Sequence, residues 1–378
     1  MRSRPGGFDR PLGLPGVWQR RFAVLTPYGW TEALAEAFAP FAAEGLVPAR
    51  VVIQHRARFV LMGAEGEFSA ETAGRFLHNT STTGLPVVGD WVAVAFKSTD
   101  SVSTIHAVLP RRSQFVRKAA GVVDKPQVVA ANFDVVLLTT GLDTDFNLRR
   151  IERYLTAAWG TGAQPVVVLT KADLVEDVAE MVAQVEAVAL GAPVLAVSAP
   201  RGLGLDQLRT FLPPGTTAVM LGMSGVGKST LVNALAGEVR QAVGEVRATD
   251  GRGRHTTTHR ELVLLPGGAL LLDTPGMREL GLWDPGEANA QTFEDIEALA
   301  RECRFRDCSH VAEPGCAVQA ALRSGGLAPE RLESYRKLDR EGAFISRKED
   351  PAASVAHRKL WASKAKTERR RRRAEEEG

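Results

Sequence analysis

The segment Gly222-Met-Ser-Gly-Val-Gly-Lys-Ser229 decides the fold of this 378-residue chain, because it fits the phosphate-loop pattern G-x-x-x-x-G-K-[ST]. An apolar run over 217–221 precedes it and a helix-like run over 229–236 follows, as a strand–loop–helix unit requires. The glycines let successive N–H groups point at phosphate oxygens, and the helix N-terminus adds partial positive charge. Lys228 is predicted to reach the β- and γ-phosphates, and the Ser229 hydroxyl to bind Mg²⁺. The predicted nucleotide-binding residues here are Gly222, Met223, Ser224, Gly225, Val226, Gly227, Lys228, Ser229 and Thr230.

A second motif, Asp273-Thr-Pro-Gly276, lies 44 residues after Ser229 and follows the apolar run over 269–272. An Asp at the carboxyl end of a buried parallel strand is well placed to contact Mg²⁺, commonly through water. Asp273 is therefore predicted to support the metal. The N–H of Gly276 is predicted to contact the γ-phosphate and to belong to a nucleotide-sensitive switch.

The choice of base is predicted from Thr170-Lys171-Ala172-Asp173, which resembles the N-K-x-D guanine motif of GTPases. The Asp173 carboxylate accepts the two N–H donors on one edge of guanine, and the Lys171 stem packs on the base face. Ser198 and Ala199 resemble the companion loop whose backbone N–H groups contact guanine O6. Thr170 replaces the usual Asn, so the amide that braces the phosphate loop is missing.

The loop over 251–258 is predicted to be the other switch. Thr257 or Thr258 is the candidate that binds Mg²⁺ and senses the γ-phosphate, and the spacing does not decide between them. His255 either orients the attacking water or contacts the phosphate backbone of a partner. Met277 stands where many GTPases have a water-orienting Gln, which predicts slow intrinsic hydrolysis that depends on a partner or on His255.

The order of these motifs predicts a rearranged α/β domain over 119–282. Apolar strands alternate with helices, among them a helix over 175–190, which is typical of a parallel sheet buried on both faces. The base-reading loops precede the phosphate loop, whereas ordinary GTPases place them after it. The ends of a compact domain often lie close together, so the same sheet tolerates this order. The pattern is that of a circularly permuted GTPase.

All three cysteines fall within 14 residues, as Cys303-x4-Cys308-x-His310-x5-Cys316. Three thiolates and one imidazole are the ligands of a closed tetrahedral Zn²⁺ site. Four protein ligands leave no open position, so the predicted zinc is structural. The sequence therefore predicts a zinc-binding segment over 283–330 and argues against a disulfide framework.

The remaining segments flank these sites. Residues 1–45 are predicted to be an extension whose first 26 residues are loosely ordered, with a helix over 30–43 that Thr31 caps. Several short strands over 46–118 predict a small RNA-binding barrel of the OB type. No run of about 20 apolar residues is present, so no membrane partner is expected.

The net charge of +3 is unevenly spread. Residues 331–373 carry +9, the last three glutamates carry −3, and residues 1–330 carry −3. The basic helix or tail over 331–378 is either a solvated end or an arm that binds a polyanion. Other candidate RNA contacts are Arg56, Arg58, Arg111 and Arg112, with solvated surface as the alternative for each.

These features together resemble the RsgA (YjeQ) family of circularly permuted GTPases. The residues that carry the resemblance are TKAD at 170–173, GMSGVGKST at 222–230, GRHTTT at 253–258, DTPG at 273–276, the four metal-ligand candidates and the OB-like VVGDWVAV at 87–94. The resemblance implies a cytoplasmic GTP hydrolase that uses GTP, Mg²⁺ and one structural Zn²⁺. It also implies binding to rRNA on the small ribosomal subunit during late maturation and departure after hydrolysis. A monomer is expected.

Three other functions compete with this interpretation. A large-subunit assembly GTPase is the nearest, and the barrel and zinc segment argue against it. An RNA-binding module with nucleotide as a structural ligand is disfavoured by the intact phosphate loop and DTPG motif. An ATP-using metabolic enzyme is disfavoured by the guanine motif.

Overall fold

The computed structural model describes residues 22–55, 58–118, 126–143, 146–238, 260–273 and 286–349. The chain divides into two compact units, Met1–Gly281 and Leu282–Gly378. Among the described residues, no helix combines the length and the apolar character needed to cross a bilayer.

The first unit begins with the 3-10 helix η1 (Ala23–Tyr28) and the helix α2 (Glu32–Ala43). The Thr31 hydroxyl caps α2 by accepting the Leu34 N–H at 3.4 Å, as predicted. The expectation of loose order up to residue 26 is wrong for 22–26, because Phe22 and Leu25 are buried. The Phe22 ring packs edge-on against other buried aromatic rings, so burial of apolar surface orders this segment.

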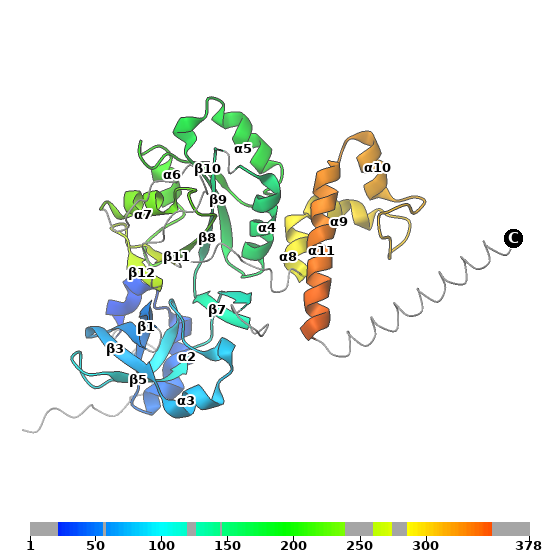
Figure 1. Cartoon of the computed structure of the whole chain (residues 1–378). Coiled ribbons are helices and arrows are strands. Elements are labelled where there is room, and N and C mark those ends of the chain that lie inside the picture. Colours follow the sequence, from blue (N-terminus) through cyan, green and yellow to red (C-terminus); the bar gives the residue numbers. More distant parts are fainter. Residues whose placement is uncertain are drawn as a thin grey trace, which may run out of the picture. The chain divides into compact units, whose positions relative to one another are not determined.

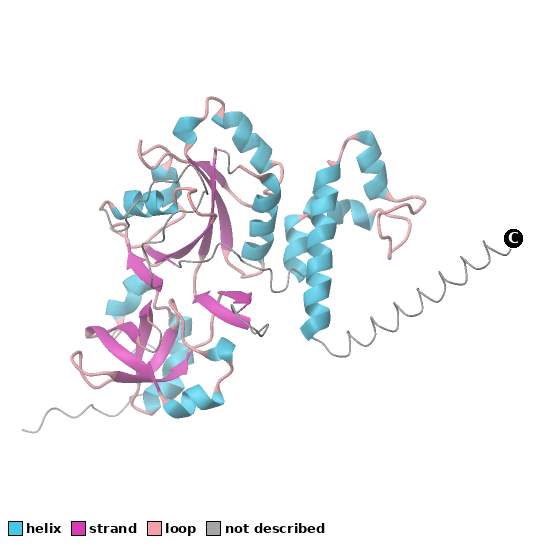
Figure 2. Cartoon of the chain, viewed as in Figure 1, coloured by secondary structure: helices cyan, strands magenta, loops and turns pink. Residues whose placement is uncertain are grey.

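A closed five-stranded barrel follows, which confirms the predicted OB-like fold (Figures 1 and 2). The strand β1 pairs with β2 on one side and β4 on the other, and β3 pairs in parallel with β5, which closes the ring. The sequence prediction lacked β3, whose polar residues alternate with the buried Phe68 and Ala70. The elements are β1 (Val47–Gln54), β2 (Phe59–Gly63), β3 (Gly66–Thr72), α3 (Gly74–Asn79), η2 (Thr82–Gly84), β4 (Trp91–Ala95) and β5 (Ser103–Val108).

The GTPase-like part of the unit is a sheet in the order β10-β9-β8-β11-β13-β12, parallel except for β12. Its middle strands are buried on both faces, as their continuous apolar sequences predict. The helix predicted over 175–190 is shorter, because Asp177 caps its start and α5 ends at Glu186. The elements are β8 (Val135–Gly141), α4 (Leu148–Trp159), β9 (Gln164–Thr170), η3 (Ala172–Leu174), α5 (Val178–Glu186), β10 (Val194–Ala196), α6 (Leu205–Arg209), β11 (Thr217–Leu221), α7 (Lys228–Ala236), β12 (Arg260–Leu264) and β13 (Leu270–Asp273).

The barrel is continuous with the sheet that contains β8 to β13. The sequence prediction did not anticipate this continuity. Strand β12 pairs antiparallel with β1, with Ile53 opposite Glu261, so eleven strands form one hydrogen-bonded series. A separate hairpin, β6 (Gln114–Lys118) and β7 (Pro126–Ala131), lies between them along the chain. The barrel therefore joins the sheet through backbone hydrogen bonds as well as through the connecting chain.

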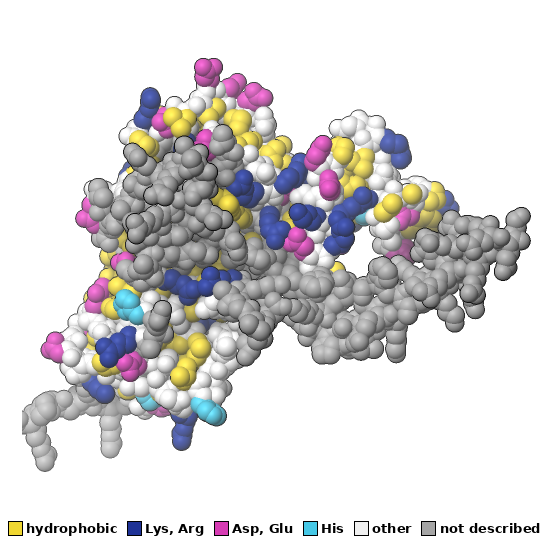
Figure 3. All heavy atoms as spheres, in the orientation of Figure 1, with side chains coloured by type: hydrophobic (Ala, Val, Ile, Leu, Met, Phe, Trp, Pro, Cys, Tyr) yellow, Lys and Arg dark blue, Asp and Glu magenta, His cyan; other side chains and the backbone are white. Residues whose placement is uncertain are grey.

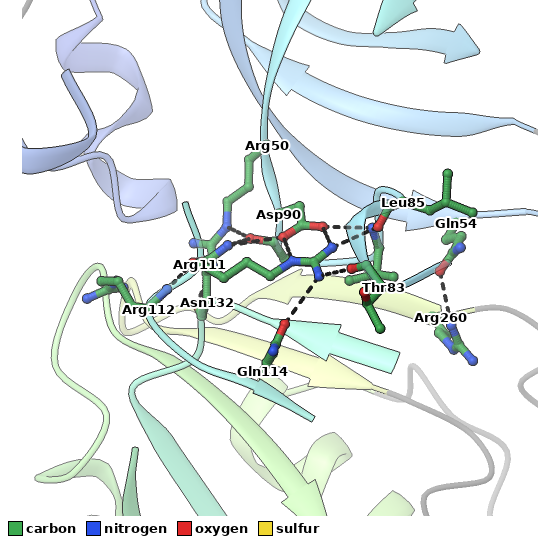
Figure 4. Close-up of polar contacts among 12 residues, drawn as sticks. Arg50, Gln54, Thr83, Leu85, Asp90, Arg111, Arg112, Gln114, Asn132 and Arg260 are labelled. Atoms are coloured by element: carbon green, nitrogen blue, oxygen red, sulfur yellow. Dashed lines mark hydrogen bonds and ion pairs between the residues drawn. The ribbon is translucent and has the colours of Figure 1, made fainter. Parts of the chain in front are cut away.

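A buried polar joint fixes this junction (Figure 4). The fully buried Arg50 guanidinium donates to Gly89 O at 3.2 Å, Asn132 O at 2.9 Å and Thr217 Oγ1 at 3.0 Å. It also donates to a carbonyl of η1. Burial lowers the pKa of Arg50 to about 9, and the nearby Asp134 carboxylate acts in the opposite direction. The Arg50 side chain thus ties the barrel to the residues that begin β11 and precede β8.

A buried ion pair between Arg111 and Asp90 lies next to this joint. Arg111 forks onto the Asp90 carboxylate, at 2.8 Å from Nε to Oδ1 and 2.7 Å from Nη2 to Oδ2, and also donates to backbone carbonyls (Figure 4). Its side chain is 11% exposed and that of Asp90 is 0% exposed. The candidate role of Arg111 as an RNA contact is therefore wrong, because its donors are used inside the fold.

The second unit consists of helices, with α11 as the longest in its described part. The Arg331 guanidinium pairs with Asp295 at 2.6 Å and lies 4.9 Å from the Phe293 ring centroid, which fastens the start of α11 to α9. The helices are α8 (Gly286–Thr292), α9 (Glu294–Arg301), α10 (Ala317–Ser324) and α11 (Pro329–Glu349). The Arg/Glu-rich end over 350–378 lies outside the described residues.

Candidate active site and metal centre

The loop between β11 and α7 adopts a phosphate-binding shape. A Cβ on Gly222 would lie 2.3 Å from Thr139 O on the neighbouring β8, so only glycine fits there. Gly225 and Gly227 have φ angles of 82° and 93°, in the left-handed region that favours glycine. The sequence requirement for glycines thus has two physical causes, close approach to a strand and a tight backbone curl.

The Lys228 side chain folds back inside this loop. Its ammonium donates to Gly222 O at 2.8 Å and to Met223 O at 2.6 Å. These bonds draw the first turn of the loop around the positive charge at the N-terminus of α7, where the helix adds partial positive charge of its own. Ser229 and Thr230 follow in the first turn of α7, as the motif requires.

The base-reading loop touches the phosphate loop through Thr170. The Thr170 hydroxyl lies 2.5 Å from Val226 O and 3.2 Å from Thr140 O. A hydroxyl has one proton to donate, and the shorter contact is to the phosphate loop. The predicted loss of the bracing amide is therefore compensated, since a hydroxyl contacts the loop from the same position.

Asp173 stands next to the Ser198–Ala199 loop. The Ser198 hydroxyl is the main cause that lowers the pKa of the Asp173 carboxyl, with a smaller contribution from Arg201, whose Nε lies 3.8 Å away. The Ala172 N–H donates to Val197 O at 3.2 Å, which ties the two loops together. The structure thus brings both predicted guanine loops to one place, with an ionised carboxylate between them.

A salt bridge that the sequence did not reveal joins the Lys171 ammonium to Asp143 Oδ2 at 2.5 Å. Asp143 follows β8, which lies between β9 and β11 in the sheet. The one sequence signal for a role of Asp143 is its position just after a buried strand.

The remaining phosphate-site candidates lie before β12, at the end of β13 or after it. This strand pairs in parallel with β11, with Val219 opposite Leu272, so Asp273 ends the strand beside the one that leads into the phosphate loop. The candidates that lie outside the described residues are His255, Thr257, Thr258 and Gly276.

Cys303, Cys308, His310 and Cys316 form one cluster, with all ligand atoms within 4.8 Å of one another. The Sγ atoms of Cys303 and Cys316 are 3.8 Å apart, and each is 3.6 Å from His310 Nδ1. A tetrahedral zinc with bonds of about 2.3 Å to sulfur and 2.05 Å to nitrogen requires about 3.8 Å and 3.6 Å for these separations. The cluster therefore has the chemistry of a Cys3His zinc site, and the atoms of Cys303, Cys316 and His310 have its separations.

Side chains around the cluster hold the ligand loop, and the spacing of the ligands did not predict them. The Glu313 carboxylate accepts the N–H groups of Ser309 at 3.0 Å and Val311 at 2.9 Å, and the Ser309 contacts are the main cause that lowers its pKa to about 2. His310 has a left-handed φ of 57°, and its carbonyl accepts from Gln319 Nε2 at 2.5 Å and from Arg336 of α11.

The candidate RNA contacts differ in their exposure and in the ion pairs that they already make. Arg58 pairs with Glu71 at 2.9 Å on the barrel surface, and Arg112 pairs with Asp134 at 2.8 Å while 47% exposed. Arg56 lies outside the described residues. On the face shown in Figure 3, Lys and Arg side chains gather over α11, where Lys337 and Arg340 are exposed.

The sequence and the fold both match those of one family of known proteins. Residues 108–283 match the family model described as RsgA GTPase. Over 362 residues the chain is 51% identical to "Small ribosomal subunit biogenesis GTPase RsgA" of Opitutus terrae, covering 93% of this chain and 99% of that protein. The protein of the same name from Streptomyces coelicolor is 48% identical, over 90% of this chain and 92% of its own length. The structure of YjeQ from Thermotoga maritima aligns with a TM-score of 0.60 and 28% identity, over 79% of this chain and 98% of that one. YloQ, titled a circularly permuted GTPase, shares the fold, with a TM-score of 0.56 and 24% identity over 79% and 95%.

Proposed function

Because the chain belongs to the RsgA family of small ribosomal subunit biogenesis GTPases, we propose that it hydrolyses GTP to assist late maturation of the small ribosomal subunit. The single observation that carries the proposal is the contact between Thr170 and Val226, which links the guanine loop to the phosphate loop of one site. The partners are the small subunit and its rRNA, and the protein acts as a cytoplasmic monomer. No observation favours a large-subunit role or a purely structural nucleotide.

The reaction is attack of water on the γ-phosphorus, with GDP and phosphate as products. Lys228 and the N–H groups of the phosphate loop stabilise the charge that develops on the phosphate oxygens. Ser229 and Asp273 would hold a Mg²⁺ ion, which would supply neutralising charge to the phosphates. Thr257 or Thr258 would complete the metal site, and Gly276 would donate to the γ-phosphate. His255 would either orient the water or contact the phosphate backbone of a partner. No covalent intermediate forms.

Guanine is selected by the two loops at the ends of β9 and β10. The Asp173 carboxylate accepts the N1–H and the amino group of guanine, while Ser198 and Ala199 offer N–H groups to O6. The test is binding of GDP, ADP and xanthosine diphosphate to the full chain and to D173N. We expect the unsubstituted chain to prefer GDP over ADP, and D173N to lose GDP and gain the xanthine nucleotide, whose C2 oxygen accepts from the new amide. Equal GDP and ADP binding by the unsubstituted chain would refute guanine selection.

The C-terminal unit binds one structural Zn²⁺ through Cys303, Cys308, His310 and Cys316. The separations among their ligand atoms support this assignment. These thiolates and the imidazole would fill all four positions around the ion, which would therefore stabilise the loop and leave no position for a reacting water.

A further inference from the structure

We propose that Asp143 is a positioning residue for guanine binding, which acts by holding the Lys171 side chain ready to receive the base. This role rests on the proposed function, since it assumes that the loop over 170–173 binds a guanine nucleotide. The Lys171 ammonium lies 2.5 Å from Asp143 Oδ2.

The backbone on both sides of this pair is fixed by the sheet. Gly141, at the end of β8, is opposite Thr170 at the end of β9, and the Leu142 N–H donates to Thr170 O at 2.9 Å. The Phe146 N–H donates to Asp143 O at 3.0 Å, which ties the Asp143 backbone to the chain just before α4. Asp143 and Lys171 therefore meet because two neighbouring strands end at the same level.

Gly141 leaves room for the pair. A Cβ at this position would lie 2.7 Å from Asp143 Oδ1 and 3.6 Å from Lys171 Cδ. Asp143 could not hold its present orientation beside such a side chain, because 2.7 Å is well inside van der Waals contact. Glycine at position 141 therefore allows the observed orientation of the Asp143 carboxylate.

Lys171 combines an unusual backbone conformation with a flexible side chain. Its φ of 61° lies in the left-handed region, which non-glycine residues rarely adopt. A lysine side chain also has a large rotamer entropy, which is lost when it is ordered against a ligand. The ion pair orders the side chain before the nucleotide arrives, so less of that entropy is lost on binding.

The pair differs from an ordinary surface salt bridge in its exposure. The side chains of Lys171 and Asp143 are 25% and 29% exposed, whereas those of Arg209 and Asp206 in α6 are 50% and 98% exposed. Solvent screens a half-buried pair less, so its charges interact more strongly. The Arg209–Asp206 pair therefore supplies a matched control outside the guanine loops.

The test is a double-mutant cycle on the full chain, with the Kd for GDP measured by calorimetry in D143N, K171M and the double variant. We expect D143N to raise the Kd about fivefold (~1 kcal/mol) and to have less than about 1.5-fold effect in the K171M background. D143E should restore part of the affinity and D206N should leave it unchanged, and thermal melting checks that each variant is folded.

Two results overturn the role of Asp143 alone. One is a normal Kd in folded D143N. The other is a D143N effect that is the same with and without Lys171, since Asp143 then acts independently of the lysine. Absence of GDP binding by the unsubstituted chain is a different result, which refutes the proposed function and this role with it.

Discussion

At position 170 a threonine hydroxyl makes a contact that an amide makes in most guanine motifs. Its bond to Val226 O at 2.5 Å is short, and Thr170 is buried. A hydroxyl lost from such a place leaves a carbonyl without a donor, which typically costs about 1–3 kcal/mol. We therefore expect Thr170 to support the predicted phosphate site as well as the predicted base site.

The substitution T170V tests this contact, because it removes the hydroxyl and keeps the branched shape. We expect the Kd for GDP to rise about tenfold, mainly through faster dissociation, while T170S stays within about twofold. The control is T156V, which removes the hydroxyl that bonds Glu152 O at 3.1 Å within α4. Stopped-flow release of a fluorescent GDP measures the effect, and equal rates in T170V and T156V would contradict the account.

At the scale of elements, the Arg50 joint connects the barrel with the starts of β8 and β11. The predicted phosphate loop leaves the opposite end of β11, at Leu221, and Asp143 follows the opposite end of β8, at Gly141. The joint should therefore matter for stability more than for nucleotide binding.

We expect R50M to destabilise the first unit by about 3 kcal/mol, because it leaves several buried acceptors without a donor. The melting temperature should fall by about 6–12 °C, with the Kd for GDP within about twofold of its original value. R58M is the control, since the Arg58–Glu71 pair is 65% and 48% exposed and should contribute less than about 1 kcal/mol. Calorimetric melting of both variants decides, and a shift below about 2 °C in R50M would show that the joint is dispensable.

The predicted zinc cluster should affect the folding of its own segment without affecting nucleotide binding. C308S should release zinc and unfold the loop between α9 and α10, because a structural zinc contributes roughly 10–16 kcal/mol to a small module. GDP binding should persist, since none of the predicted nucleotide ligands belongs to this unit. Metal analysis, circular dichroism and GDP titration measure the three effects, with S324A at the end of α10 as a control outside the ligand loop. Full zinc content in C308S would refute the ligand set.

The sequence predicted elements best where one physical requirement dominates. The strand over 217–221 matches β11 to the residue, because a continuous apolar run before a glycine-rich loop has few alternatives. Strand β3 was missed because its alternation is weak, since Phe68 is the one large apolar residue in it and Ala70 is small. Arg50 gave no signal, since a lone arginine in an apolar strand does not reveal which distant carbonyls it contacts.

At the scale of the whole molecule, motif order predicted the permuted sheet, and the structure added its continuity with the barrel through β12 and β1. That pairing joins residues about 200 positions apart and depends on backbone geometry, so no local pattern encodes it. Lys171 and Asp173 were predicted from a motif, whereas Asp143 was not, because its partner is fixed by strand register. Long-range contacts therefore account for most of what the sequence left open.

The most direct test of the central claim is steady-state GTP hydrolysis by the full chain alone, with purified small ribosomal subunits and with purified large subunits. The account predicts slow turnover alone, an increase of at least about tenfold with small subunits, and no increase with large subunits. Hydrolysis that is fast without subunits, or that both subunits stimulate equally, would contradict it.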